Sequence, residues 1–318
     1  MSAPVPVCEG DSITICEVGP RDGFQSEKLQ IPTGRKVEVI NALFASGLRH
    51  IQVTSFVSPR AVPQLADAEA VLSAIDKPKG TSLSALVPNV RGAERAASAG
   101  VDVVHTVVSA SETHNQKNLN RSIEQTLAEI KHIFYLMSGT GVRVEGGIAT
   151  AFGCPFEGQV SASQIARIAK FYHDNGACRI GLGDTTGMAT PHTVRSAVRA
   201  IRSVVPELDI GLHFHNTRGV GLACVMAGLA EGVTYYDASV GGLGGCPFAA
   251  GATGNISTED LVYLLQESGY CTGVDLEQII SAARLTETVV GRELPGQVMK
   301  AGPRLRRYDP NHIATAKG

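Results

Sequence analysis

Apolar and polar positions along the chain follow one repeating pattern. An amphipathic stretch ends at a glycine, and a run of β-branched residues soon follows, as at Gly47, Gly100 and Gly232. A glycine just past a helix takes the left-handed conformation that ends the helix. A parallel strand that is covered on both faces is a continuous apolar run rather than an alternating one. The pattern therefore predicts helices that lead through short loops into buried parallel strands.

Eight segments are strand candidates, and a stretch with helical period follows each of them. They lie near residues 12–17, 49–54, 81–87, 102–108, 142–148, 178–182, 208–214 and 233–238. Eight such βα units match a (β/α)8 TIM barrel. A doubly wound open sheet is the alternative, but no GxGxxG motif follows the first strand. We expect one TIM-barrel domain over residues 1–318, with the barrel over about 12–270 and additional C-terminal helices and a tail over about 271–318.

The bulk composition excludes several classes of protein. The 28 basic and 30 acidic side chains nearly balance, which argues against a nucleic-acid groove or a polybasic membrane surface. No apolar run approaches the ~20 residues that span a bilayer, and residues 1–10 lack the features of a signal peptide. Seven cysteines without CxxC spacing are more typical of reduced thiols than of a disulfide framework or a zinc ribbon. We expect a cytoplasmic protein with no membrane or nucleic-acid partner.

His213 and His215, in the seventh strand candidate, are the most informative polar residues. Side chains two residues apart in a strand point to the same face, so the two imidazoles are expected side by side, with Phe214 on the opposite face. Two neutral imidazoles in this arrangement are half of a divalent-metal site. The alternative is a pair of histidines that only face solvent or form hydrogen bonds in the core.

Other polar residues lie where the strands of a barrel would end. Catalytic residues of TIM barrels come from these C-terminal ends and from the loops that follow them. The candidates are Arg21, Asp22 and Gln25 after the first strand, Gln52 and Ser55 in the second, Asn89 after the third, Asp184 after the sixth, and Cys246 and Asn255 after the eighth. We expect all of them to face one end of the barrel.

Asp22, His213, His215 and Asn255 together offer two nitrogen and two oxygen ligands. Such a set suits Mg²⁺ or Mn²⁺ with open positions for substrate oxygens. Zinc is a possible alternative, although closed structural zinc sites are usually rich in cysteine. Asp22 can instead be a turn aspartate beside Gly23, and Asn255 can be a helix N-cap.

Several motifs resemble those of one enzyme family. The stretch EVGPRDGFQ (17–25) resembles the signature of the DRE-TIM metallolyases. The stretches TSFVSP (54–59), GCPFEG (153–158), LGDT (182–185) and GGLGGCP (241–247) are similar to the 3-hydroxy-3-methylglutaryl-CoA lyase branch of that family. The resemblance covers most of the chain, and the motifs are specific in combination.

The resemblance implies a lyase that cleaves a tertiary 3-hydroxyacyl-CoA into acetyl-CoA and a keto acid such as acetoacetate, as in leucine catabolism and ketone-body formation. An acyl-CoA substrate and a homodimer are implied with it. The family's metal ligands fall on Asp22, His213, His215 and Asn255, its catalytic arginine on Arg21 and its loop cysteine on Cys246, and further active-site positions fall on Gln25, Ser55 and Asp184. Gln52 and Asn89 complete the set of substrate-binding candidates.

The chemistry of C–C cleavage accounts for these residue types. A metal lowers the pKa of the substrate hydroxyl, and Arg21 stabilises the developing enolate oxygen. Cys246, in a glycine-rich loop, can protonate the enolate carbon, unless it is a loop cysteine with no role. Three acceptors of the hydroxyl proton remain open: Asp184, His213 and a metal-bound hydroxide.

One residue departs from the family pattern. The lyases of this branch carry a glutamate at the position of Gln52 in the second strand. Glutamine keeps the shape but loses the charge and cannot accept a proton in this role. Either the exchange is tolerated, or the substrate is a related 3-hydroxyacyl-CoA such as citramalyl-CoA or a longer-chain hydroxyglutaryl-CoA.

Two further functions remain as alternatives. A condensing acyltransferase of the isopropylmalate synthase type belongs to the same superfamily. Those chains usually carry a long C-terminal regulatory region, and this chain ends soon after the barrel, so a lyase is favoured. The other alternative is a non-catalytic barrel that acts as a binding protein. The presence of the metal ligands and the loop cysteine argues against it.

Overall fold

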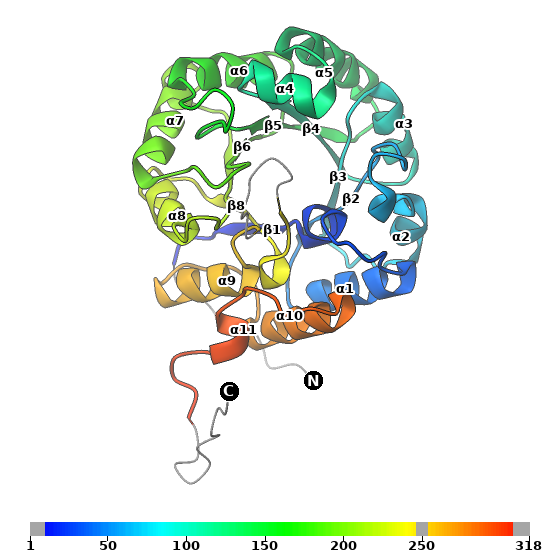
Figure 1. Cartoon of the computed structure of the whole chain (residues 1–318), viewed down its shortest axis with the longest axis vertical. Coiled ribbons are helices and arrows are strands. Elements are labelled where there is room, and N and C mark those ends of the chain that lie inside the picture. The colour runs from blue at the N-terminus through cyan, green and yellow to red at the C-terminus, as the bar shows by residue number, and fades with distance from the viewer. Residues whose placement is uncertain (1–9, 246–253, 308–318) are drawn as a thin grey trace.

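Eight parallel strands close into a barrel, and helices surround it (Figure 1). The computed structural model describes residues 10–245 and 254–307. Each strand pairs with the next along the chain, and β1 closes the ring by pairing with β8. The strands are β1 (Thr14–Glu17), β2 (His50–Ser55), β3 (Ser82–Leu86), β4 (Val103–Ser109), β5 (Arg143–Ala149), β6 (Ile180–Gly183), β7 (Ile210–His213) and β8 (Tyr235–Ala238). The predicted TIM barrel is confirmed, and a strand lies at each predicted place.

Helices follow every strand and cover the outside of the barrel (Figure 1). They are α1 (Thr33–Ala45), α2 (Ala68–Ala74), α3 (Val90–Ser98), α4 (Glu112–Leu119), α5 (Ile123–Met137), α6 (Ala162–Asp174), α7 (Pro191–Val204), α8 (Gly221–Ala230) and α9 (Thr258–Glu267). The expected C-terminal helices are α10 (Leu276–Val290), which packs against α1, and the short α11 (Val298–Ala301). The described residues also form three short helical turns, η1 (Gly19–Gly23), η2 (Pro63–Leu65) and η3 (Val240–Gly242).

The glycines that were predicted to end helices have the expected backbone. Gly47, Gly100 and Gly232 have φ angles of 102°, 82° and 72°. At Gly47 a side chain is excluded by space as well, because a Cβ atom would lie 2.4 Å from the carbonyl oxygen of Gly273. These turns direct each chain segment from the outer helices back into the barrel wall.

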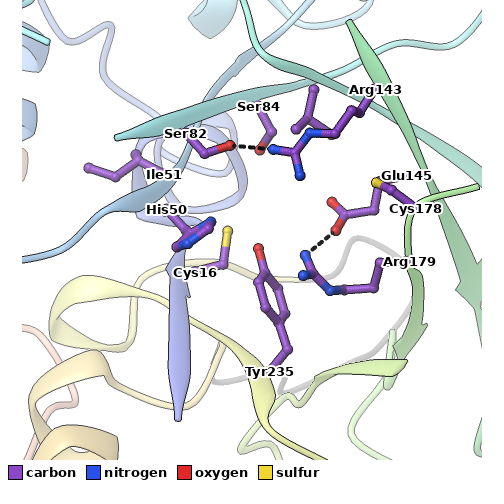
Figure 2. A pocket seen from close by; sticks show the side chains of 11 residues that line it. Cys16, His50, Ile51, Ser82, Ser84, Arg143, Glu145, Cys178, Arg179 and Tyr235 are labelled. Carbon is purple, nitrogen blue, oxygen red and sulfur yellow. Dashed lines mark hydrogen bonds and ion pairs between the residues drawn. The ribbon is translucent and has the colours of Figure 1, made fainter. Parts of the chain in front are cut away.

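Polar side chains fill the N-terminal end of the barrel. Glu145 of β5 accepts a hydrogen bond of 2.8 Å from Nη1 of Arg179, and this guanidinium lies 3.5 Å from the centre of the Tyr235 ring (Figure 2). A cavity of about 20 Å³ remains between them, which is room for about one ordered water molecule. The cavity is too small for an acyl-CoA and lies at the end of the barrel opposite the two histidines. This network therefore belongs to the barrel core.

The cysteines correct one expectation. Cys16, Cys154, Cys178 and Cys224 are free, but Cys271 is disulfide-bonded. The prediction of reduced thiols is therefore wrong for Cys271. CxxC spacing reveals only pairs that are close in the chain, so it gave no signal for this bond. Within residues 10–245 and 254–307, no helix is both long and apolar enough to cross a membrane.

Candidate active site

Arg21 and Asp22 lie in a single π-helical turn, η1, directly after β1. The carbonyl oxygen of Val18 accepts the N–H groups of both residues, at 3.1 Å for Arg21 and 2.7 Å for Asp22. Gly19 allows this turn to pack closely, because a Cβ atom there would lie 2.6 Å from Oε1 of Glu17. Turns of this kind interrupt the regular repeat of side-chain directions and are frequent at functional sites. The turn places both side chains at the C-terminal end of the barrel.

His213 and His215 lie side by side at the end of β7, as the sequence predicted. Their ring centres are 5.2 Å apart, while Phe214 between them is fully buried in the core. Oδ2 of Asp22 lies 3.9 Å from Nε2 of His215. Ligand atoms of Asp22, His213 and His215 all lie within 4.8 Å of one another. The structure therefore brings together three residues that are far apart in the sequence.

Asn255 completes this group from the segment after β8. Its Nδ2 donates to Oδ2 of Asp22 and to the carbonyl oxygen of Leu243, both at 2.8 Å. Its Oδ1 is buried and has no hydrogen-bond partner among the described residues. The alternative that Asn255 is a helix N-cap is wrong, because Ser257 caps α9.

The donor set fits a divalent cation. Besides Oδ1 of Asn255, Nδ1 of His215 is buried without a partner in the described part of the chain. Buried polar atoms without a partner are unfavourable, so they indicate a missing ligand or ion. One carboxylate, two imidazoles and one amide oxygen are ligand types that Mg²⁺ and Mn²⁺ accept.

Burial and neighbouring charges set the protonation of the three ionisable residues. Burial raises the pKa of Asp22, but Arg21 and the two histidines outweigh it and lower this pKa to about 2. Burial, followed by the charge of His213, lowers the pKa of His215 to about 4. Burial also lowers the pKa of His213, yet the carboxylate of Asp237 raises it more, so the net shift is upwards. At neutral pH Asp22 is an anion and His215 is neutral, as metal binding requires.

Arg21 is held by Gln52 and by Asp22, which is itself one of the predicted metal ligands. Its Nε donates to Oε1 of Gln52, and its Nη1 donates to Oδ1 of Asp22. Nε2 of Gln25 also donates to this Asp22 oxygen, at 3.3 Å. The Arg21 guanidinium is thus fixed at the edge of the predicted metal site, where it can face a bound substrate.

The remaining predicted residues lie at this end of the barrel in different settings. Oδ1 of Asp184 accepts the N–H groups of Met188 (2.6 Å) and Ala189 (2.9 Å), and burial raises its pKa to about 6. Oγ of Ser55 is buried without a partner among the described residues. Oδ1 of Asn89 accepts the N–H of Gly92 (2.9 Å) as the N-cap of α3, so its contact with substrate stays a prediction. Cys246 lies outside the described residues.

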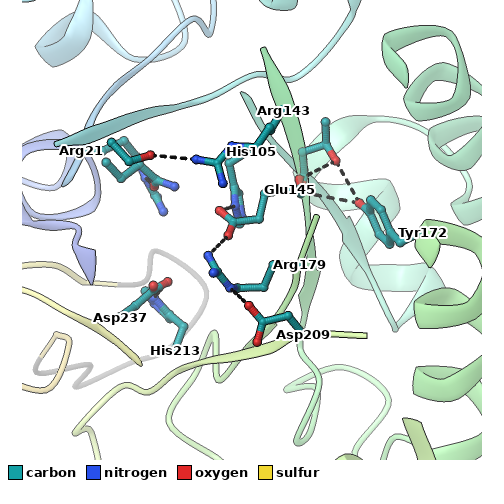
Figure 3. Close-up of polar contacts among 12 residues, drawn as sticks. Arg21, His105, Arg143, Glu145, Tyr172, Arg179, Asp209, His213 and Asp237 are labelled. Carbon is teal, nitrogen blue, oxygen red and sulfur yellow. Dashed lines mark hydrogen bonds and ion pairs between the residues drawn. The ribbon is translucent and has the colours of Figure 1, made fainter. Parts of the chain in front are cut away.

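Sequence reasoning missed one residue that contacts this group. This residue is Asp237, at the end of β8. Its Oδ2 lies 3.2 Å from Nδ1 of His213 (Figure 3). An acidic residue in an otherwise apolar strand candidate was the available signal. Its partner could not be read from the sequence, because the contact depends on the register of β7 and β8, which pairs His213 with Asp237.

Known proteins match this chain over most of its length. The model of the HMGL-like family matches residues 12–286. A hydroxymethylglutaryl-CoA lyase of Bacillus subtilis is 42% identical over 285 residues, which are 90% of this chain and 95% of that protein. The mitochondrial hydroxymethylglutaryl-CoA lyase of Gallus gallus is 40% identical over 293 residues, which are 92% of this chain and 98% of that protein.

A solved structure matches just as fully. It is an HMG-CoA lyase from Acinetobacter baumannii in complex with coenzyme A and 3-methylmalate. It superposes with a TM-score of 0.90 at 41% sequence identity and covers 97% of this chain and 99% of its own. The resemblance to the 3-hydroxy-3-methylglutaryl-CoA lyases that the sequence motifs indicated is confirmed. The chain belongs to the HMGL-like family.

Proposed function

We propose that this protein is a divalent-metal-dependent lyase that cleaves 3-hydroxy-3-methylglutaryl-CoA into acetyl-CoA and acetoacetate. The observation that carries the proposal is the convergence of Asp22, His213 and His215, with Arg21 beside them at the C-terminal end of a TIM barrel. The relatives of known activity support the substrate, because those at about 40% identity are hydroxymethylglutaryl-CoA lyases. Catalytic activity in this family argues against a non-catalytic barrel.

The reaction divides into a cleavage and a protonation. The hydroxyl of the substrate loses its proton, the C2–C3 bond breaks, and the electron pair moves to C2 and the thioester oxygen as an enolate. The hydroxyl carbon becomes the ketone of acetoacetate, and a proton added to C2 completes acetyl-CoA. Asp22, His213, His215 and Asn255 would hold Mg²⁺ or Mn²⁺, and the bound cation would supply Lewis-acid polarisation of the hydroxyl.

The side chains divide the remaining tasks. Arg21 stays cationic throughout and donates to the oxygen where negative charge develops. Asp184, whose pKa of about 6 suits a general base, is our proposed acceptor of the hydroxyl proton. Its backbone bonds to Met188 and Ala189 hold the carboxylate in position. The proton donor to C2 is proposed to be Cys246.

Release of acetyl-CoA from 3-hydroxy-3-methylglutaryl-CoA tests the proposal. Protein treated with a chelator should be inactive, and added Mg²⁺ or Mn²⁺ should restore turnover. His215→Ala should stay inactive at every metal concentration, while His192→Ala, on α7 outside the site, should behave as the wild type. Absence of metal-dependent turnover of any acyl-CoA would contradict the proposal.

A related substrate is the second candidate, because Gln52 replaces the glutamate expected in this branch. Citramalyl-CoA and a longer-chain hydroxyglutaryl-CoA should therefore be assayed in parallel. Turnover of one of these, without turnover of 3-hydroxy-3-methylglutaryl-CoA, would replace the substrate and keep the reaction. A homodimer is also proposed, and light scattering on the purified protein tests it.

A further inference from the structure

The loop after β6 folds around the carboxylate of Asp184, the residue at its start. The carbonyl oxygen of Asp184 accepts the N–H of Gly187 at 3.2 Å, which closes a tight turn. Oδ1 of Asp184 accepts the N–H groups of Met188 and Ala189, which follow directly after this turn. The direction of the carboxylate therefore depends on where the turn lies.

The next loop along the barrel, after β7, holds this turn from outside. Nη1 of Arg218 donates to the carbonyl oxygens of Thr186 (3.0 Å) and Gly187 (2.6 Å). Thr217 packs against the same turn, because a Cβ atom at Gly187 would lie 2.6 Å from Cβ of Thr217. Gly187 also has a φ of 64°, which side chains rarely allow. Two adjacent residues, Thr217 and Arg218, thus grip the turn that follows Asp184.

The segment that carries this grip also carries the predicted metal ligands. His215 lies two residues before Thr217, and the carbonyl oxygen of His213 accepts the backbone N–H of Asp184 at 2.9 Å. One short stretch of chain, 213–218, therefore connects the ligands of the cation with the turn that directs the carboxylate. A general base must lie within hydrogen-bond reach of the proton that it takes, and a displacement of about 1 Å can cost roughly 10²-fold in rate.

We infer that Arg218 is a positioning residue, which holds the turn after Asp184 where the carboxylate can reach the hydroxyl proton of the substrate. The inference rests on the proposed function and deepens it. The Nη1 group carries two N–H donors in a fixed plane, so it can serve two successive carbonyl oxygens at once. Arg218 is exposed, and substitutions at exposed positions usually change the stability of a fold little. Its contribution is to the geometry of the site.

Arg218→Met should lower kcat by roughly 10- to 100-fold, with little change in the KM for the acyl-CoA. The affinity for Mn²⁺, measured by calorimetric titration, should stay the same, because the guanidinium acts on the turn and not on the ligands. Arg202→Met is the matched control. The Arg202 guanidinium likewise donates to two successive carbonyl oxygens, those of Glu231 and Gly232, but at the opposite end of the barrel.

Hydrogen exchange measures the position of the turn without any substrate. The amides of Met188 and Ala189 should exchange faster in Arg218→Met than in the wild type, because the turn that presents them to the carboxylate is loosened. Arg202→Met should leave their exchange unchanged. Wild-type protection of both amides in Arg218→Met would show that the guanidinium does not hold the turn, and would overturn the inference.

A double variant shows whether Arg218 acts through Asp184. Arg218→Met should slow the Asp184→Asn variant no further, because the two changes remove one function. Losses that add would mean that Arg218 acts independently of Asp184. A raised KM with an unchanged kcat would mean that Arg218 contacts the acyl-CoA, and a matching loss of Mn²⁺ affinity would mean that it acts through His215. Each of these three results would overturn the inference.

Gly187→Ala displaces the same turn from its other side and gives an independent variant. It should lower kcat and retain Mn²⁺ affinity, as Arg218→Met does. Gly176→Ala controls for backbone strain, because Gly176 has a φ of 89° and an added Cβ atom would have no neighbour within 4 Å. Failure of the proposed function is a separate result, since wild-type protein would then cleave no acyl-CoA, while hydrogen exchange would still report whether Arg218 holds the turn.

Discussion

Oδ2 of Asp237 lies 3.2 Å from Nδ1 of His213, across the pairing of β7 with β8 (Figure 3). The contact engages Nδ1 and leaves Nε2 as the nitrogen with which this histidine can bind a cation. Histidines that bind metals usually donate their second N–H to a carboxylate or carbonyl, which fixes the tautomer and the orientation of the ring. Asp237 therefore holds a proposed ligand in place from the neighbouring strand.

Asp237→Asn should weaken metal binding by roughly 10- to 100-fold. Asparagine is uncharged and no longer selects the tautomer of His213 that presents a free Nε2. Calorimetric titration of the metal-free protein with Mn²⁺ measures the affinity without depending on turnover. Asp209→Asn is the matched control, because Asp209 pairs with Arg179 at the other end of the barrel. If the two variants bind Mn²⁺ with equal affinity, Asp237 does not position His213 for metal binding.

Arg21→Met should leave the fold intact and lower turnover by roughly 10²–10³-fold or more. The side chain is 11% exposed at the mouth of the barrel and makes polar contacts with Gln52 and Asp22, so little apolar packing is lost. Steady-state rates and the melting temperature measure the two effects separately. A large drop in melting temperature together with the lost activity would argue against a purely catalytic role.

Gly244→Ala should reduce metal affinity and turnover together. Gly244 has a φ of 122°, and a Cβ atom there would lie 2.4 Å from Nδ2 of Asn255 and 3.4 Å from Oδ2 of Asp22. The added methyl group must therefore displace the amide of a proposed ligand. Gly245→Ala is the matched control, because its nearest neighbour would be Ser26 at 3.9 Å. The prediction fails if the two variants bind Mn²⁺ alike.

Asp184→Asn separates proton acceptance from positioning. Asparagine keeps an Oδ1 acceptor for the N–H groups of Met188 and Ala189 but cannot take up a proton. If Asp184 is the base, turnover falls by roughly 10²–10⁴-fold while the melting temperature changes little. Turnover close to that of the wild type would assign Asp184 to positioning of its loop and leave His213 as the candidate side chain.

The fold could be predicted from the sequence because the sequence signals for its helices and strands are local. A glycine such as Gly232 ends a helix through its own backbone conformation, and the strand that follows is apolar because both of its faces are buried. The histidine pair was accessible for the same reason, since two residues of one strand share a face. The disulfide of Cys271 was missed because Cys271 is in no CxxC motif.

The contacts inside the site could not be predicted as well from the sequence, because they depend on strand register and on side-chain direction. The sequence placed Gln52 and Arg21 at the same end of the barrel but gave no sign that one holds the other. Likewise, Asn255 could be a ligand or a helix cap until the structure showed Ser257 in the capping position. Asp237 became visible only as the register partner of His213.

Two buried carboxyl groups hold the backbone just after β1 and β8. Oε1 of Glu17 accepts the N–H groups of Gly19 (2.7 Å) and Val240 (2.9 Å), and Oε2 of Glu259 accepts that of Gly241 (3.0 Å). Burial raises the pKa of Glu17 from 4.5 to about 7 and that of Glu259 from 4.5 to about 8, against the opposing effect of these donors. The folded protein therefore retains these protons at a pH where the unfolded chain has lost them.

The free energy of unfolding should consequently fall as the pH rises from 4.5 through about 7 for Glu17 and about 8 for Glu259. The contribution is complete below pH 4.5, where both states are protonated, and is lost above the folded-state pKa. Glu17→Gln and Glu259→Gln should each flatten this slope by at most about 1.4 kcal/mol per pH unit, because glutamine stays neutral and still accepts the backbone N–H groups. Urea unfolding across this pH range measures the slope, with Glu124→Gln on the exposed start of α5 as the control. If both buried variants keep the wild-type slope, the two carboxyl groups are already ionised in the folded protein.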